Sequence, residues 1–117
     1  MTATEIIDGL VLGGVDDKDI SDTHEYIDVR GLIDSNEDCT VNAAWASGIA
    51  RTIWILRQDG RKVFVHCAGG MERSPLVVAV YLAEYHNMTL DDAYKLIQSK
   101  RPSIFDRREW LGKKFSW

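Results

Sequence analysis

A run of nine residues near the middle of the sequence contains the groups that phosphate chemistry needs. The run is His-Cys-Ala-Gly-Gly-Met-Glu-Arg-Ser, residues 66–74, and five residues separate Cys67 from Arg73. A loop of that length can turn successive backbone N–H groups toward one anion, and Gly69 and Gly70 permit the backbone angles that this requires. Arg73 adds a planar, permanently charged group that can bind two phosphate oxygens. Cys67 would then lie beneath the phosphorus atom as a nucleophile.

The same loop is expected to activate its own cysteine. The backbone N–H groups, the start of the following helix and Arg73 all favour the thiolate form of Cys67. The thiol is therefore expected to be ionised before substrate binds. Ser74 can donate a hydrogen bond to the sulfur, and His66 is expected to hold the loop in shape through a backbone hydrogen bond. We therefore predict hydrolysis of a phosphomonoester through a phosphocysteine intermediate. The residues expected to bind the phosphate are Ala68, Gly69, Gly70, Met71, Glu72 and Arg73.

The elements that flank this loop are predicted to hold it in place. Residues 62–66 form a short β-branched and aromatic run, which is typical of a buried central strand. Arg73, Ser74 and Pro75 open a helix that runs to about His86, because proline is favoured in the first turn of a helix. Strand, glycine loop and helix follow one another in the order that an anion site needs.

The rest of the chain predicts a small α/β domain around that unit. Strands are expected over 9–14 and 26–33, and a turn at Asp34 ends the second one. Larger apolar residues at positions 41, 45, 49, 53 and 56 predict a helix over 41–56 with those residues on its inner face. A helix capped by Thr89 should end at Arg101, and a last short helix is expected over 106–115. We predict one compact domain over 1–117, a small, mostly parallel central sheet flanked by helices.

Composition limits the classes of protein that this chain could belong to. Residues 1–40 contain 11 acidic and 2 basic side chains, a net charge of −9, while the rest of the chain has a net charge of +5. The acidic pI of about 5.3 argues against nucleic acid as a partner. No apolar run is long enough to span a membrane and no signal peptide is apparent, so a soluble cytoplasmic protein is expected. A monomer is expected because no long apolar stripe is left over once the core is assigned. Two cysteines, Cys39 and Cys67, form neither a disulfide scaffold nor a zinc motif, and no metal or cofactor is expected.

Residues 66–74, followed by Pro75 and an apolar helix, resemble the signature loop of the protein tyrosine phosphatase superfamily, and most closely that of its dual-specificity branch. Residues 10–13 resemble the opening strand of that branch, and residues 90–102 resemble its C-terminal helices. The resemblance covers nearly the whole chain and implies a compact, minimal member. It implies a cysteine phosphatase fold and a phosphorylated protein, or another phosphomonoester, as substrate.

The resemblance also implies an aspartate on a neighbouring loop that acts as the general acid. Asp34 lies 33 residues before Cys67 and follows a predicted strand, as in the family. Asp38 is the rival and Glu37 a more distant one, because a loop could present any of the three carboxylates to the substrate. The interpretation that each of them is a solvated loop residue stays open.

Two departures from the family pattern leave substrate identity open. Only nineteen residues lie between Gly14 and Asp34, so a strand-helix unit and recognition loops are expected to be missing and the active site to be shallow. Glu72 places a carboxylate beside Arg73, where it would oppose a phosphate if its side chain turned inward.

Two other functions remain open from the residues alone. A rhodanese-like sulfurtransferase or an arsenate reductase could use the same loop, although the Ser74-Pro75 pair and the position of the loop argue against both. A phosphate-binding module that has lost catalysis is the second alternative. It is weakened because Cys67 and Arg73 are both intact.

Overall fold

The computed structural model describes residues 2–17 and 24–112, and within these ranges four strands form one small sheet. Its members are β1 (Thr4–Ile7), β2 (Leu10–Gly14), β3 (Glu25–Asp28) and β4 (Val63–Cys67), arranged in the order β1-β2-β4-β3. Strand β4 pairs in parallel with β2 and with β3, whereas β1 pairs antiparallel with β2 at the edge. The predicted mostly parallel sheet is confirmed.

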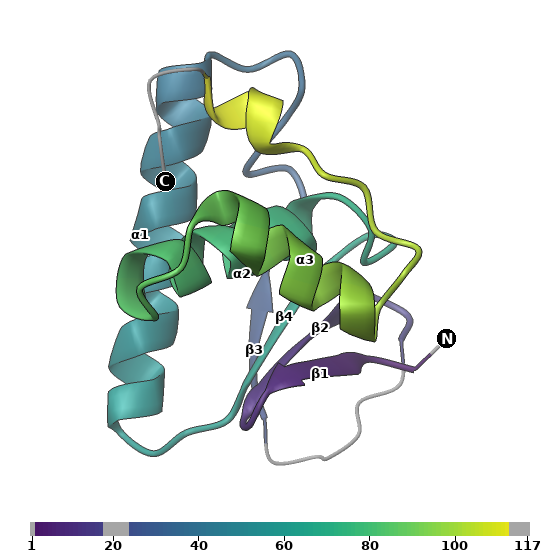
Figure 1. Ribbon diagram of the computed structural model, residues 1–117, viewed down its shortest axis with the longest axis vertical. Coiled ribbons are helices and arrows are strands. Elements are labelled where there is room, and N and C mark those ends of the chain that lie inside the picture. Colours follow the sequence, from purple (N-terminus) through teal and green to yellow (C-terminus); the bar gives the residue numbers. More distant parts are fainter. Residues whose placement is uncertain (1, 18–23, 113–117) are drawn as a thin grey trace.

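Three α-helices and a short 3-10 helix accompany the sheet (Figure 1). They are α1 (Cys39–Gln58), α2 (Arg73–Tyr85), α3 (Leu90–Lys100) and η1 (Arg108–Leu111). Helix α2 contacts β2, β4 and both neighbouring helices, and nine of its residues are buried. The helices share one core with the alternate residues Val63, Val65 and Cys67 of β4. No helix in the described ranges is long and apolar enough to cross a membrane.

The parallel strands end at the same edge of the sheet. Gly14 is paired with Cys67 across β2 and β4, and Asp28 is paired with His66 across β3 and β4. The loop after β4, the loop before α1 and the helix η1 lie at this end of the molecule (Figure 1). Loops at the carboxyl ends of parallel strands are where open α/β sheets bind ligands.

Local signals explain where the helices begin. The Asp38 carboxylate accepts a hydrogen bond from the Thr40 N–H at 2.7 Å and caps α1. Thr89 caps α3 in the same way by accepting from the Asp92 N–H at 3.1 Å. Side-chain oxygens at the N-cap satisfy N–H groups that have no partner inside the helix. The predicted helices over 41–56, 73–86 and 89–100 are therefore confirmed with small changes at their ends.

Three elements differ from the prediction. Strand β3 stops at Asp28 rather than at Ile33, because the Asp28 carboxylate binds the Arg30 backbone N–H at 3.0 Å in a tight turn and Gly31 follows with a φ of +76°. Strand β1 was not predicted. The last helix is only the single turn of η1, and residues 113–115 of the predicted helix lie outside the described ranges.

The buried face of α1 is rotated by about one residue from the predicted one. Val41 and Trp45, which the helical period placed inside, are 40% and 47% exposed. Asn42 and Ala46 are fully buried in their place. With Ile55 also 49% exposed, α1 has an apolar outer face, whereas the expectation of a monomer assumed that no such face was left over.

Candidate active site

Cys67 is the last residue of β4, and its side chain points into the core beneath the loop that follows. It is only 3% exposed. The Gly70 N–H donates a hydrogen bond to Sγ at 3.2 Å, so the loop has curled back over the sulfur. A hollow of about 100 Å³ lies over the loop, and the loop alone supplies its lining. The lining residues are Cys67, Ala68, Gly69, Met71, Glu72 and Arg73, so Gly70 is the one predicted phosphate-binding residue that does not line it.

The surroundings of Cys67 favour its thiolate. Burial raises the pKa of the thiol, but hydrogen bonds from the Ser74 hydroxyl and from the backbone N–H groups of Ser74, Gly70 and Glu72 outweigh burial and leave that pKa below its usual value. The Ser74 hydroxyl lies 3.4 Å from Sγ and 3.2 Å from the Gly13 carbonyl oxygen. Since a hydroxyl has one hydrogen, it can donate to the thiolate only by releasing the Gly13 carbonyl.

Replacing Ser74 with alanine should move the pH at which Cys67 becomes reactive to a higher value, because the thiolate loses one donor. The measurement is the rate of Cys67 alkylation by iodoacetamide against pH, in a Cys39→Ser background so that one thiol reacts. Ser99→Ala removes a hydroxyl that donates to the Leu96 carbonyl on α3 and should leave the midpoint in place. An unchanged midpoint in Ser74→Ala would mean that the hydroxyl serves the Gly13 carbonyl instead.

Two glycines allow the loop to approach β2. A Cβ on Gly70 would lie 2.5 Å from backbone atoms of Gly13 and Gly14, and the φ of Gly70 is +70°. A Cβ on Gly14 would lie 2.7 Å from the Ala68 carbonyl oxygen. Both contacts are shorter than real side chains accept, so the loop and the end of β2 can meet only because both positions are glycine.

Arg73, the first residue of α2, is held by the segment before α1. Its Nε donates a hydrogen bond to the Ile33 carbonyl oxygen. Its guanidinium carbon lies 5.9 Å from the centre of the Trp110 ring, a cation–π contact with η1. The predicted arginine is therefore oriented by two segments distant in sequence.

The two rival acids have different surroundings. Asp38 is exposed and its carboxylate caps α1. Asp34 is partly exposed and lies close enough to Arg73 for the arginine's charge to act on it. The Asn36 N–H, 3.0 Å from the Asp34 carboxylate, lowers the pKa of that carboxyl most; burial opposes it, and the Ser35 hydroxyl and Arg73 lower the pKa further. Of these two carboxyls, Asp34 is the one whose pKa the charge of Arg73 lowers.

The Glu72 carboxylate is paired with a cation from outside the loop. Its carboxylate forms an ion pair with Arg107 at 3.0 Å, and the Arg107 guanidinium also lies over the rings of Phe105 and Trp110. The Phe105 N–H donates to the Met71 carbonyl oxygen at 2.8 Å. The segment before η1 thus holds one side of the loop. The positive charge of Arg107 offsets the negative charge of Glu72, which would otherwise repel a phosphate.

His66 lies on the opposite face of the sheet from Cys67. Its ring packs edge-on against Phe64 and Tyr26, and Nδ1 lies 3.8 Å from the Asp28 carboxylate. Within the described residues Nδ1 has no hydrogen-bond partner. The expected hydrogen bond from His66 to the loop is therefore not made through Nδ1.

Sequence reasoning missed three residues that support the site. Trp110 contacts Arg73, Arg101 donates from Nε to the Gly70 carbonyl oxygen at 3.0 Å, and Asn42 bonds the Asp34 backbone. Asn42 lies at helical spacing from Ala46, Ile49 and Ile53, and this spacing is the one signal that could have revealed Asn42 as buried. No local pattern marks the other two.

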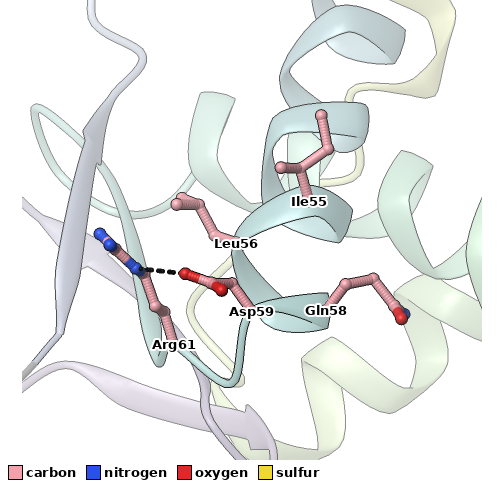
Figure 2. A pocket seen from close by; sticks show the side chains of 5 residues that line it. All are labelled: Ile55, Leu56, Gln58, Asp59 and Arg61. Carbon is pink, nitrogen blue, oxygen red and sulfur yellow. Dashed lines mark hydrogen bonds and ion pairs between the residues drawn. The ribbon is translucent and has the colours of Figure 1, made fainter.

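A larger hollow of about 520 Å³ lies at the C-terminal end of α1 (Figure 2), and no residue of this loop lines it. The dashed line in Figure 2 joins Arg61 and Asp59. Their Nε and Oδ2 atoms are 3.0 Å apart and form an ion pair. Arg61 also pairs with Glu25 at 2.8 Å, so its charge is already satisfied, and no cysteine or histidine lines the hollow. Elsewhere in the described ranges, no three acidic, histidine or cysteine side chains are grouped as metal ligands would be.

Comparisons with known proteins agree with this geometry. A family model described as "Dual specificity phosphatase, catalytic domain" matches residues 16–113. Among curated proteins, the tyrosine-protein phosphatase vhp-1 of Caenorhabditis elegans is 38% identical over 56 residues, and the human dual specificity protein phosphatase 26 is 44% identical over 52 residues. These stretches cover 48% and 44% of this chain.

The matched stretches span only a small part of those relatives, 8% of the first and 25% of the second. Solved structures are similar over more of their length. A leucine rich repeat and phosphatase domain containing protein from Entamoeba histolytica has a TM-score of 0.79 at 15% identity, covering 94% of this chain and 85% of that one. The human tyrosine phosphatase-like serine/threonine/tyrosine-interacting protein has a TM-score of 0.76 at 20% identity, covering 94% and 91%. At these identities the likeness concerns the fold.

Proposed function

The chain belongs to the dual specificity phosphatase family, and on that premise we propose that it hydrolyses phosphomonoesters of proteins through a phosphocysteine intermediate at Cys67. The observation that carries this proposal is the buried Cys67 thiol, whose pKa is lowered within a loop that folds back over the sulfur. Family membership favours this function over the sulfurtransferase and arsenate reductase interpretations.

In the first step the Cys67 thiolate attacks the phosphorus atom, an S–P bond forms and the P–O ester bond breaks. The electron pair of that bond stays on the leaving oxygen, which takes a proton from the Asp34 carboxyl. The Arg73 Nη groups and the N–H groups of the loop bind the other phosphate oxygens and offset the developing charge. Because Arg73 Nε already bonds the Ile33 carbonyl, the guanidinium keeps one orientation during this step.

In the second step water attacks the phosphorus atom of the phosphocysteine. The Asp34 carboxylate takes a proton from that water, the S–P bond breaks, and its electron pair returns to sulfur as the Cys67 thiolate. The Ser74 hydroxyl, 3.4 Å from the sulfur, stabilises this leaving group by donating to it. Inorganic phosphate is released, Cys67 is again a thiolate and Asp34 is again a carboxylic acid, which are the protonation states in which the first step began.

The test of this function is hydrolysis of para-nitrophenyl phosphate in EDTA, followed by acid quenching and mass spectrometry. We expect turnover that EDTA does not reduce, and a Cys67-containing peptide that carries one added phosphoryl group. Pure, folded protein without turnover would contradict the proposal. Tight phosphopeptide binding without turnover would then favour the phosphate-binding module.

Replacing Asp34 with asparagine should lower kcat for phosphotyrosine by about 10²- to 10⁴-fold, because a poor leaving group needs the acid. Asp38→Asn is the matched control. Asparagine caps helices about as well as aspartate, so this variant removes the rival carboxylate while α1 keeps its cap. Loss of activity in Asp38→Asn instead of Asp34→Asn would assign the acid to Asp38.

The pH profile gives a second measure of Asp34. The acid must be protonated to donate, so the wild-type rate should fall as pH rises through the pKa of Asp34, and this fall should be absent in Asp34→Asn. Hydrogen bonds and Arg73 lower that pKa in the free protein, whereas a bound phosphate dianion opposes the arginine's charge and raises it. The alkaline fall of kcat should therefore lie at higher pH than that of kcat/KM.

The substrate is proposed to be a phosphorylated protein, as family membership supports. A hollow of about 100 Å³ lined by loop residues alone gives little basis for selecting phosphotyrosine over phosphoserine or phosphothreonine. We propose activity toward both kinds of side chain. A cytoplasmic location is proposed as well, because Cys67 and Cys39 are both free thiols and a thiolate nucleophile needs a reducing compartment.

A further inference from the structure

Asn42 lies in the first turns of α1 with its side chain fully buried. Its Nδ2 donates to the Asp34 carbonyl oxygen at 2.8 Å and to the Trp110 carbonyl oxygen at 3.1 Å. Its Oδ1 accepts from the Asp34 N–H at 3.1 Å. Two carbonyls need donors and one N–H needs an acceptor, so only this orientation of the carboxamide satisfies all three partners.

The two segments that Asn42 joins both bear on the phosphate site. One carries the Asp34 carboxyl and, one residue earlier, the Ile33 carbonyl that accepts from Arg73 Nε. The other carries the Trp110 ring, which lies against the Arg73 guanidinium. Asn42 bonds the backbone of Asp34 on both sides of its Cα, which fixes the direction in which the Asp34 side chain leaves the loop.

A residue needed only for packing would be apolar at this position. The neighbouring buried residues of α1 are alanines and isoleucines, among them Ala43 and Ala46. Burying a carboxamide is costly unless its polar atoms find partners. Asn42 finds these partners in backbone groups of two loops. Hydrogen bonds are directional, whereas apolar packing is not.

We infer that Asn42 is a positioning residue for the general acid: its carboxamide holds the Asp34 loop, braced against the Trp110 segment, so that the Asp34 carboxyl reaches the leaving oxygen. This inference rests on the proposed phosphatase function. Asn42 touches no reacting atom and acts through Asp34.

A double-mutant cycle tests this inference in the full chain. Asn42→Ala is expected to lower kcat/KM for phenyl phosphate by about 10²-fold, as misplacement of a catalytic group by about 1 Å can do. In an Asp34→Asn background the same substitution should cause little further loss, because no acid remains to be misplaced. Losses that multiply independently in the double variant would overturn the inference.

The leaving group provides a readout that a merely structural role would not move. Difluoromethylumbelliferyl phosphate has a good leaving group that needs little protonation, so Asn42→Ala should reduce its hydrolysis much less than that of phenyl phosphate. Equal losses on both substrates would contradict a role through Asp34.

Controls keep the outcomes distinct. Gln58→Ala removes an exposed amide from the same helix and should leave both substrates unaffected. Asn42→Ser retains a neutral polar group too short to bridge the two loops, so it should repeat the leaving-group effect if Asn42→Ala does not fold. Unfolding of both variants would make the carboxamide a folding requirement and count against the inference. If the Cys67→Ser variant hydrolysed substrate at the wild-type rate, the proposed function itself would be refuted, whatever the result with the Asn42 variants.

Discussion

Replacing Cys67 with serine is expected to lower kcat for para-nitrophenyl phosphate by about 10⁴-fold or more, the scale seen when a nucleophile is removed from an enzyme. The donors around Sγ lower the pKa of a thiol, but a serine hydroxyl starts from a far higher pKa and stays protonated. The measurement is release of para-nitrophenolate in EDTA at neutral pH. Orthophosphate should still bind, because the loop and Arg73 are unchanged.

Cys39→Ser is the matched control for this substitution. Cys39 is exposed at the start of α1, and its Sγ donates a hydrogen bond to the Glu109 carbonyl oxygen at 3.7 Å. Its replacement should leave turnover unchanged. If Cys67→Ser kept its activity while Cys39→Ser lost it, the nucleophile would be assigned to the wrong cysteine.

The loop and the elements around it could be predicted because their signals are local. A β-branched run makes β4, two adjacent glycines permit the turn, and Pro75 suits the first turn of α2. Each of these signals lies within a few residues of the feature that it determines. The predicted strand and helix are therefore found close to their predicted ends.

The inner face of α1 could not be predicted from residue size. The helical period assigned Val41 and Trp45 to the core because they are large and apolar. The structure buries Asn42 instead, since its carboxamide finds a partner in Trp110, 68 residues away. A buried polar side chain is explained only by its partners, and no sequence pattern near position 42 identifies them.

The choice between Asp34 and Asp38 was also open in the sequence, because spacing alone allowed both. The distinction depends on what each carboxylate binds: Asp38 caps a helix, while Asp34 lies near Arg73. The pairing of Glu72 depends likewise on Arg107, 35 residues further along the chain. Side-chain partners of this kind are set by tertiary packing.

Arg101 was predicted only as the end of a helix, yet it is a buried charge that braces the loop. Its side chain is 2% exposed and pairs with Asp17 at 2.6 Å, across 84 residues of sequence. Its remaining donors bind the Gly70 and Thr2 carbonyl oxygens and the Thr4 hydroxyl. One guanidinium therefore joins β1, the turn after β2 and the loop over Cys67.

Replacing Arg101 with methionine is expected to lower the free energy of unfolding by about 3–5 kcal/mol, because it removes the guanidinium that offsets the charge of the Asp17 carboxylate, a side chain only 11% exposed. Such a loss is a large part of the stability of a small domain. Urea unfolding followed by tryptophan fluorescence measures it. The exposed Arg51→Met on α1 is the matched control and should change stability by no more than about 0.5 kcal/mol.

The dependence of this loss on pH identifies its cause. Burial raises the pKa of Asp17, but the Gly14 N–H and Arg101 outweigh burial and lower that pKa overall. The ion pair therefore stabilises the fold fully above the usual pKa of aspartate, and its stabilisation is lost as pH falls. The difference between wild type and Arg101→Met should therefore shrink in acid, where Asp17 is protonated. Adding Asp17→Asn to Arg101→Met should recover part of the loss at neutral pH. A loss that is independent of pH and unaffected by Asp17→Asn would mean that Arg101 acts through the Gly70, Thr2 and Thr4 hydrogen bonds, and that the ion pair contributes little.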